Sequence, residues 1–284
     1  MKHIFRCTLV VLTISLAVPA QAHRAWMLPS ATVLSGESPW ITVDAAVSND
    51  LFYFEHVPLR LSGIGESAAK DEGRAPMPLH ILAPDGSTLE GRNGKTGRYR
   101  TTFDVPLEQK GTYKLALANA RIMATYTENG ERVRWMGPID QLHKNLPEAA
   151  EDLQVIQGSS RMEVFVTSGS PSDSVFVPTN RGLELSPVTH PNDLYAGETA
   201  EFRFTLDGQP AADVAVVVIP GGNRYRDALG EIRTMTDADG KVSITWPAAG
   251  MYWMEAQYDT AEGVTAPVTR RRASYSATLE VLAL

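Results

Sequence analysis

SGESPWITVDA, residues 35–45, has a counterpart in AGETAEFRFTL, residues 196–206. In each stretch a Gly-Glu turn precedes a run of alternating hydrophobic and polar residues, which predicts a strand with one buried face. A second hydrophobic strand follows each of them, at 78–82 and at 214–219. A Gly-x-Tyr sequence then opens a late strand in both halves. This repeated order predicts two consecutive all-β domains, each an immunoglobulin-like or transthyretin-like sandwich with loop insertions.

The chain divides into four parts. A basic start, an apolar run over residues 9–18 and an Ala-Gln-Ala sequence form a secretory signal peptide, so residues 1–22 are expected to be removed. The N-terminal sandwich then spans 23–170, a linker rich in Ser, Pro and Asn spans 171–182, and the C-terminal sandwich spans 183–284.

The composition argues against a nucleic-acid-binding function and indicates the compartment in which the protein works. Lys and Arg number 26 against 33 Asp and Glu, which gives a formal net charge of −7 and no basic surface for a nucleic acid. After the signal peptide no run reaches the roughly 20 apolar residues that span a membrane. Cys7 is the single cysteine and lies within the signal peptide. We therefore expect a periplasmic or secreted protein without disulfides. Residues 147–154 begin with a proline followed by an acidic residue and predict one short helix in an insertion.

Cleavage after Ala22 would make His23 the first residue of the mature protein. Its free α-amino group and its Nδ1 atom can chelate one metal ion, and a second imidazole completes a three-nitrogen set suited to copper. Such a histidine brace occurs in copper-dependent polysaccharide monooxygenases and in some periplasmic copper carriers. The alternative is that a histidine follows the cleavage sequence by chance.

Three other histidines are candidate partners for His23. Immunoglobulin-like topology places the start of the first strand near the loop between the second and third strands, which holds His56. The same pole is expected to receive His143, from the long insertion, and His80, at the start of the third strand. We rank His56 first, His143 second and His80 third.

A second cluster is predicted in the C-terminal sandwich. His190 and Asp193 could bind a metal, and Arg224 and Arg226, which flank Tyr225, could hold a carboxylate or phosphate. A structural role is the favoured interpretation: the first pair would cap turns and the arginines would pair with nearby acidic residues. Because consecutive sandwiches are expected to meet end to end, this cluster should lie apart from His23.

Three segments together resemble a bacterial periplasmic family of unknown function that was once grouped with NikM-like nickel-uptake proteins: HRAWMLP at 23–29, THPNDL at 189–194 and GGNRYRD at 221–227. Members of that family begin with histidine after processing. The resemblance implies a role in transition-metal acquisition or handling, with an outer-membrane TonB-dependent receptor as a partner. It transfers a metal role to His23 alone.

The leading hypothesis is therefore a non-enzymatic periplasmic protein that binds copper, or alternatively nickel or iron, through His23. A second hypothesis is a copper-dependent monooxygenase that acts on polysaccharides. A third is an adhesion or receptor-accessory module that binds no metal.

Overall fold

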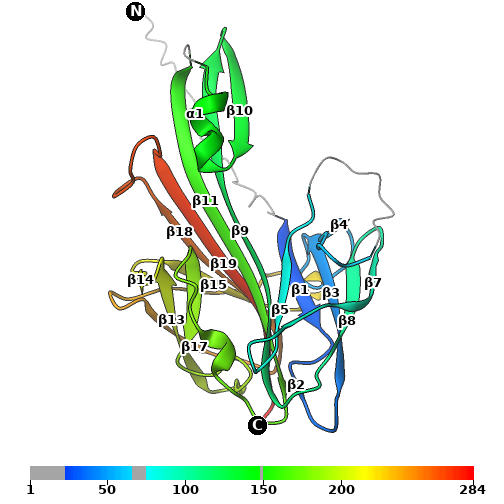
Figure 1. The fold of residues 1–284 in the computed structure, drawn as a ribbon. Coiled ribbons are helices and arrows are strands. Elements are labelled where there is room, and N and C mark those ends of the chain that lie inside the picture. Colours follow the sequence, from blue (N-terminus) through cyan, green and yellow to red (C-terminus); the bar gives the residue numbers. More distant parts are fainter. Residues whose placement is uncertain (1–22, 66–74, 148–149) are drawn as a thin grey trace, which may run out of the picture.

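The described part of the protein is all-β and is built from three sheets (Figure 1). The computed structural model describes residues 23–65, 75–147 and 150–284, and the expected signal peptide lies outside them. The five-stranded sheet has the order β1 (Arg24–Pro29), β3 (Trp40–Ser48), β8 (Thr101–Pro106), β7 (Arg92–Thr96), with β4 (Val57–Pro58) beside β3. The four-stranded sheet has the order β12 (Leu183–Pro187), β13 (Thr199–Leu206), β14 (Gln209–Pro210), with β17 (Lys241–Thr245) beside β13.

A ten-stranded central sheet joins the two halves of the chain. Its order is β16 (Ile232–Met235), β15 (Ala215–Pro220), β18 (Gly250–Thr260), β19 (Arg270–Val281), β11 (Glu151–Ser168), β9 (Gly111–Glu128), β5 (Leu79–Leu82), β6 (Thr88–Leu89), with β10 (Glu131–Gly137) beside β9 and β2 (Val33–Leu34) beside β11. β11 and β19 run parallel, in register from Ile156 opposite Arg270 to Val164 opposite Thr278. The late strands of the two sandwiches are therefore neighbours in one sheet.

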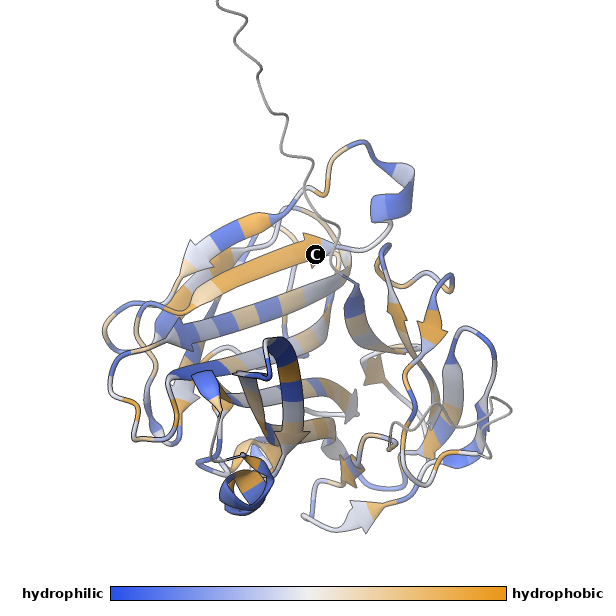
Figure 2. Ribbon diagram, turned by 90° about the horizontal axis from the view of Figure 1, so that it is seen from above, coloured by the Kyte–Doolittle hydropathy of each residue, from blue (hydrophilic) through white to orange (hydrophobic). Residues whose placement is uncertain are grey.

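Side chains on the two faces of β11 contribute to two different hydrophobic cores. Val164 and Val166 pack into the core beneath the five-stranded sheet, with Ile41, whereas Phe165 packs into the core beneath the four-stranded sheet, with Phe202. Successive side chains of a strand point to opposite faces, so the two outer sheets cover opposite faces of the central one. Hydrophobic residues follow the strands and hydrophilic residues dominate the peripheral turns (Figure 2).

The upper parts of β9 and β11 extend beyond both sandwiches and form an arm with β10 (Figure 1). The connection from β10 to β11 holds the 3-10 turn η1 (Ile139–Gln141) and the helix α1 (Leu142–Asn145). Leu142 is fully buried against Ile122 and Val155. The predicted helix over 147–154 is wrong, because Glu151 already begins β11, and the short helix of this insertion precedes that position.

Two further 3-10 turns complete the described structure, η2 (Ser174–Phe176) and η3 (Asn223–Tyr225). In the part of the chain that the structure describes, no helix is long and apolar enough to cross a membrane.

Candidate functional site

The structure brings His23 and His56 together. Their imidazole rings are stacked, with centroids 4.0 Å apart and an angle of 22° between the ring planes. His23 directly precedes β1 and His56 directly precedes β4, and both strands pair with β3 at Val47. Both histidines are exposed. The first-ranked partner of His23 is thus its neighbour in space.

Hydrogen bonds fix the loop that leads from β3 to His56. The Glu55 carboxylate accepts a 2.6 Å hydrogen bond from the Asn49 backbone N–H, which closes the loop on itself. The hydroxyl of buried Ser48 donates to the Asp50 carbonyl and accepts from the indole N–H of Trp26. These hydrogen bonds at the base of the loop hold His56 in a defined place relative to β1.

Aromatic residues in the same loop act as packing groups. Phe52 and Phe54 both contact the fully buried Trp26, with ring centroids 5.5 and 5.6 Å apart. Phe52 has a φ of 62°, a left-handed conformation that is rare for a bulky residue. A Cβ atom placed on Gly221 would lie 3.0 Å from the Phe52 ring and 3.1 Å from the Met251 carbonyl oxygen, so the turn before η3 packs closely against this loop.

The turn at 221–227 contacts the loop next to the histidine pair, so this part of the second cluster does not lie apart from His23 as expected. The Asn223 amide oxygen accepts from the Leu51 backbone N–H at 2.8 Å, and its nitrogen donates to Asp50 at 3.1 Å. Arg224 lies 3.5 Å from the Asp50 carboxylate and 4.0 Å above the Tyr53 ring. The shared central sheet places the two sandwiches side by side rather than end to end.

A second contact between the sandwiches lies beside His23. The indole N–H of Trp253, on β18, donates to the Ala25 carbonyl at 3.1 Å, and the Arg24 guanidinium lies over the Trp253 ring. On the same face of β18, burial raises the pKa of the Glu255 carboxyl, while the Gln257 side chain and the charge of Arg24 act in the opposite direction. We call the contacts that Asn223, Arg224 and Trp253 make with the N-terminal sandwich the seam. The seam holds the start of β1 and the loop before His56 in place.

The other two candidate partners lie elsewhere. His143 is on α1, which lies along the arm, whereas His23 is at the start of β1 (Figure 1). His80 is exposed on β5, opposite Ala116 of β9.

His190 has structural partners. Its Nδ1 atom accepts from the Asn192 backbone N–H and its Nε2 atom lies 3.0 Å from the Thr112 hydroxyl, so the ring is neutral with its proton on Nε2. Phe176 packs against the ring edge, and burial lowers the pKa of His190. Asp193 is exposed and donates its backbone N–H to the His190 carbonyl. His190 therefore shapes the turn before Leu194.

The arginines of the predicted second cluster also have structural partners, though not the expected ones. Arg226 donates to three carbonyls, those of Gly221, Pro220 and Leu229, and so closes the turn that carries η3. Tyr225 is 82% exposed. Arg224 pairs across the seam with Asp50 rather than with an acidic neighbour in sequence.

Sequence reasoning missed the seam residues Asp50, Asn223 and Trp253 as supports of the site. Within residues 23–65, 75–147 and 150–284, no three His, Cys, Asp or Glu side chains are grouped as metal ligands. A site here would need a ligand besides these side chains, and a free α-amino group on His23 would be one.

The profile of a family of domains of unknown function, DUF4198, matches residues 20–260. No curated protein matches the chain. The solved structures similar to it include the D0–D1 domain of intimin, with 10% identity and a TM-score of 0.22 over 90% of this chain and 97% of that one. Activated Escherichia coli alpha-2-macroglobulin has 14% identity and a TM-score of 0.24 over 90% and 20%. A DUF3823 family protein from Bacteroides uniformis has 13% identity and a TM-score of 0.26 over 79% and 97%.

Proposed function

The chain belongs to DUF4198, a family of domains of unknown function, and we propose that it is an exported transition-metal-binding protein that holds its ion between His23 and His56. The observation that carries the proposal is the 4.0 Å separation of the two imidazole rings. Imidazole nitrogens bind first-row metals at about 2.0–2.1 Å, so two of them on one ion lie within about 4.2 Å of each other. The lone pairs of an imidazole lie in the plane of its ring, so the two stacked rings would turn about their side-chain torsions to direct one nitrogen each at the same ion. Both side chains are exposed and their rings are neighbours, so this turn needs no movement of the backbone.

Removal of residues 1–22 would supply the third ligand. The freed α-amino group and the His23 ring would then chelate the ion from one residue, and the His56 ring would complete three nitrogen ligands. Copper(II) binds such nitrogen ligands more strongly than nickel(II) or iron(II) does, which favours copper among the three metals.

The rest of the site holds the backbone on either side of the histidine pair in place. The Glu55 to Asn49 hydrogen bond orders the loop before His56, and the Trp253 indole holds the backbone of β1 two residues after His23. A preorganised pair of ligands binds a metal more tightly because less conformational entropy is lost on binding. We propose that the protein works in the periplasm in metal uptake or handling, with an outer-membrane TonB-dependent receptor as its partner.

The mass of the intact protein tests the proposal. The chain is expressed with its own signal sequence and no N-terminal tag, purified from the periplasm and weighed before and after addition of Cu(II). We expect the mass of residues 23–284 and the gain of one copper ion. His23→Ala and His56→Ala should each lower the copper affinity by at least about 100-fold, because each removes a ligand.

Two matched histidine variants serve as controls. His80→Ala and His143→Ala remove exposed imidazoles that lie away from His23, so they should leave copper binding unchanged. A mature chain that begins at another residue, or equal copper binding by wild-type and His23→Ala protein, would contradict the proposal and favour a module that binds no metal. Oxygen-dependent cleavage of chitin or cellulose by the copper-loaded protein would instead reveal a monooxygenase.

A further inference from the structure

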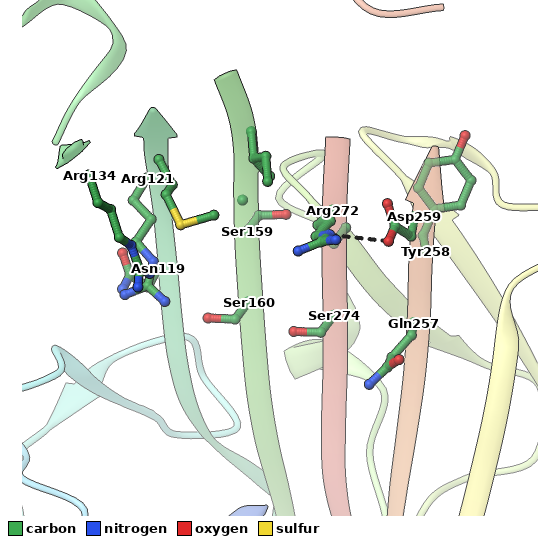
Figure 3. A pocket seen from close by; sticks show the side chains of 14 residues that line it. Asn119, Arg121, Arg134, Ser159, Ser160, Gln257, Tyr258, Asp259, Arg272 and Ser274 are labelled. Carbon is green, nitrogen blue, oxygen red and sulfur yellow. Dashed lines mark hydrogen bonds and ion pairs between the residues drawn. The ribbon is translucent and has the colours of Figure 1, made fainter. Parts of the chain in front are cut away.

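A hollow of about 510 Å³ lies on the central sheet and is lined by residues of β9, β10, β11, β19 and β18 (Figure 3). It opens on the face of β11 that carries Ser160 and, two and four residues further along the strand, the core residues Met162 and Val164. The histidine pair contributes no residue to it.

Positive charge gathers in the hollow although the whole chain is acidic. Arg121, on β9, and Arg134, on β10, are exposed, and Figure 3 shows their side chains lying together with that of Asn119. Arg272 lies across the hollow on β19. The carboxylate among the lining residues is that of Asp259, and Arg270 and Arg272 already bind it at 2.5 and 3.1 Å.

Arg121 and Arg134 therefore face the hollow without a carboxylate partner among the described residues. The described side-chain contact of the Arg134 guanidinium is a 3.5 Å approach to the sulfur of Met136. Two adjacent cations repel each other, and an anion between them would remove that repulsion. Guanidinium groups bind carboxylates and phosphates through paired N–H donors, which makes such an anion the expected occupant.

The floor of the hollow is open because its residues are short. Gly158 and Ser160 lie on β11, between Arg121 on β9 and Arg272 on β19, and Ser274 is two residues after Arg272 on β19. The two serine hydroxyls, with the Asn119 amide, can donate to or accept from ligand hydroxyl groups. A Cβ atom on Gly158 would meet the Arg121 carbonyl oxygen at 3.6 Å, an ordinary contact, so a side chain there would extend into the hollow without displacing the backbone.

The spacing of the strands sets the size of the ligand. β9 and β19 are separated by β11, so their backbones lie two strand spacings, or about 10 Å, apart. We propose that the hollow binds a small polyhydroxylated dianion, with one carboxylate or phosphate held by Arg121 and Arg134 and the other by Arg272. The hydroxyl groups between them contact the serines of the floor. This inference does not depend on metal binding.

Calorimetric titration of the metal-free mature protein at low ionic strength tests the inference. The probes are glucarate, which carries a carboxylate at each end of a hydroxylated six-carbon chain, and fructose 1,6-bisphosphate, its counterpart with two phosphates. We expect one of them to bind at a single site, and the preferred probe distinguishes carboxylates from phosphates. Gluconate, with one carboxylate on the same chain, should bind at least about tenfold more weakly, because it reaches one group of arginines.

Two kinds of variant test separately the arginine charges and the open space above Gly158. The double substitution Arg121→Ala and Arg134→Ala should weaken binding of the dianion at least about tenfold. Gly158→Ile should weaken it to the same extent, although all the arginines of the hollow remain. Arg132→Ala is the matched control, because Arg132 is also on β10 but contacts Thr125 outside the lining. Unchanged melting temperatures show that the variants fold. Absence of binding to both dianions, equal affinity for gluconate, or undiminished binding by the double variant would overturn the inference.

Discussion

Phe52 combines an unfavourable backbone conformation with extensive packing. A φ of 62° is uncommon for residues other than glycine, asparagine and aspartate, and it costs about 1–3 kcal/mol when the residue is bulky. The contacts with Trp26 and Gly221 offset this strain. The structure therefore stores strain in the loop that carries His56.

We predict that Phe52→Gly is more stable than Phe52→Ala by about 1 kcal/mol. Both variants lose the ring, but glycine adopts a positive φ without strain and alanine does not. Urea denaturation of the two variants measures the difference in the free energy of unfolding. In an ordinary strand or helix alanine is the more stable of the two, so an order with alanine above glycine would show that the backbone there is not left-handed.

The half-buried His190 should make the stability of the protein depend on pH. Burial lowers its pKa in the folded state, whereas in the unfolded chain the imidazole titrates at its ordinary pKa of about 6.5. As the pH falls through that value the unfolded state binds a proton that the folded state does not, so the free energy of unfolding decreases. We predict that stability falls between about pH 7 and pH 5, and that His190→Gln flattens this decline.

Melting temperatures measured from pH 5 to pH 8 test this pH dependence. His80→Gln is the control, because that histidine is exposed on β5, and its profile should follow that of the wild-type protein. A decline of equal steepness in His190→Gln would assign the pH dependence to other groups.

At the scale of elements, the arm has a small hydrophobic core of its own. Leu142 packs there against Ile122, Ala124 and Val155, and it is fully buried. We predict that Leu142→Ala destabilises the arm by about 2–5 kcal/mol, because it removes buried methyl groups and leaves a cavity. Hydrogen exchange should show lost protection in α1 and β10.

The same variant separates the arm from the histidine pair. β1 and β3 pack into other cores, so their amide protection and the copper affinity should stay at the wild-type level in Leu142→Ala. Reduced copper binding would instead indicate that His143, the second-ranked partner, takes part in the site.

The sequence predicted where the strands of the sandwiches lie better than it predicted which strands pair with each other. Alternation located the strands within residues 35–45 and 196–206, which correspond to β3 and β13, because one buried face leaves a period of two. It could not show that β11 pairs in parallel with β19, since alternation identifies a face and not a neighbour. Residues 151–160 of β11 are mainly polar in the arm, which hid this part of the strand and favoured the wrong helix.

The candidate site was predictable to a similar degree. Loop order in an immunoglobulin-like sandwich was enough to select His56 as the neighbour of His23. The contact between Asp50 and Asn223 joins residues 173 positions apart, and no local pattern in the sequence indicates it. The arginines of the hollow were missed for the same reason, because Arg121 and Arg134 meet only once β10 folds back on β9.

At the scale of the whole molecule, the shared sheet should make the two sandwiches unfold together. β11 contributes Val164 to one core and Phe165 to the other, and Asn223 bonds across the seam to Asp50. Neither core can lose β11 without exposing the other. We therefore predict a single calorimetric transition whose van't Hoff enthalpy equals the measured enthalpy.

Substitutions on β11 distinguish one cooperative unit from two. Val164→Ala should lower the free energy of unfolding by about 2 kcal/mol and Phe165→Ala by about 3–5 kcal/mol, because both side chains are almost fully buried. Each should shift the whole transition to lower temperature and leave it single. A thermogram that splits into two peaks, with each variant moving a different peak, would mean that the sandwiches unfold separately and that the seam does not couple the start of β1 to the C-terminal half.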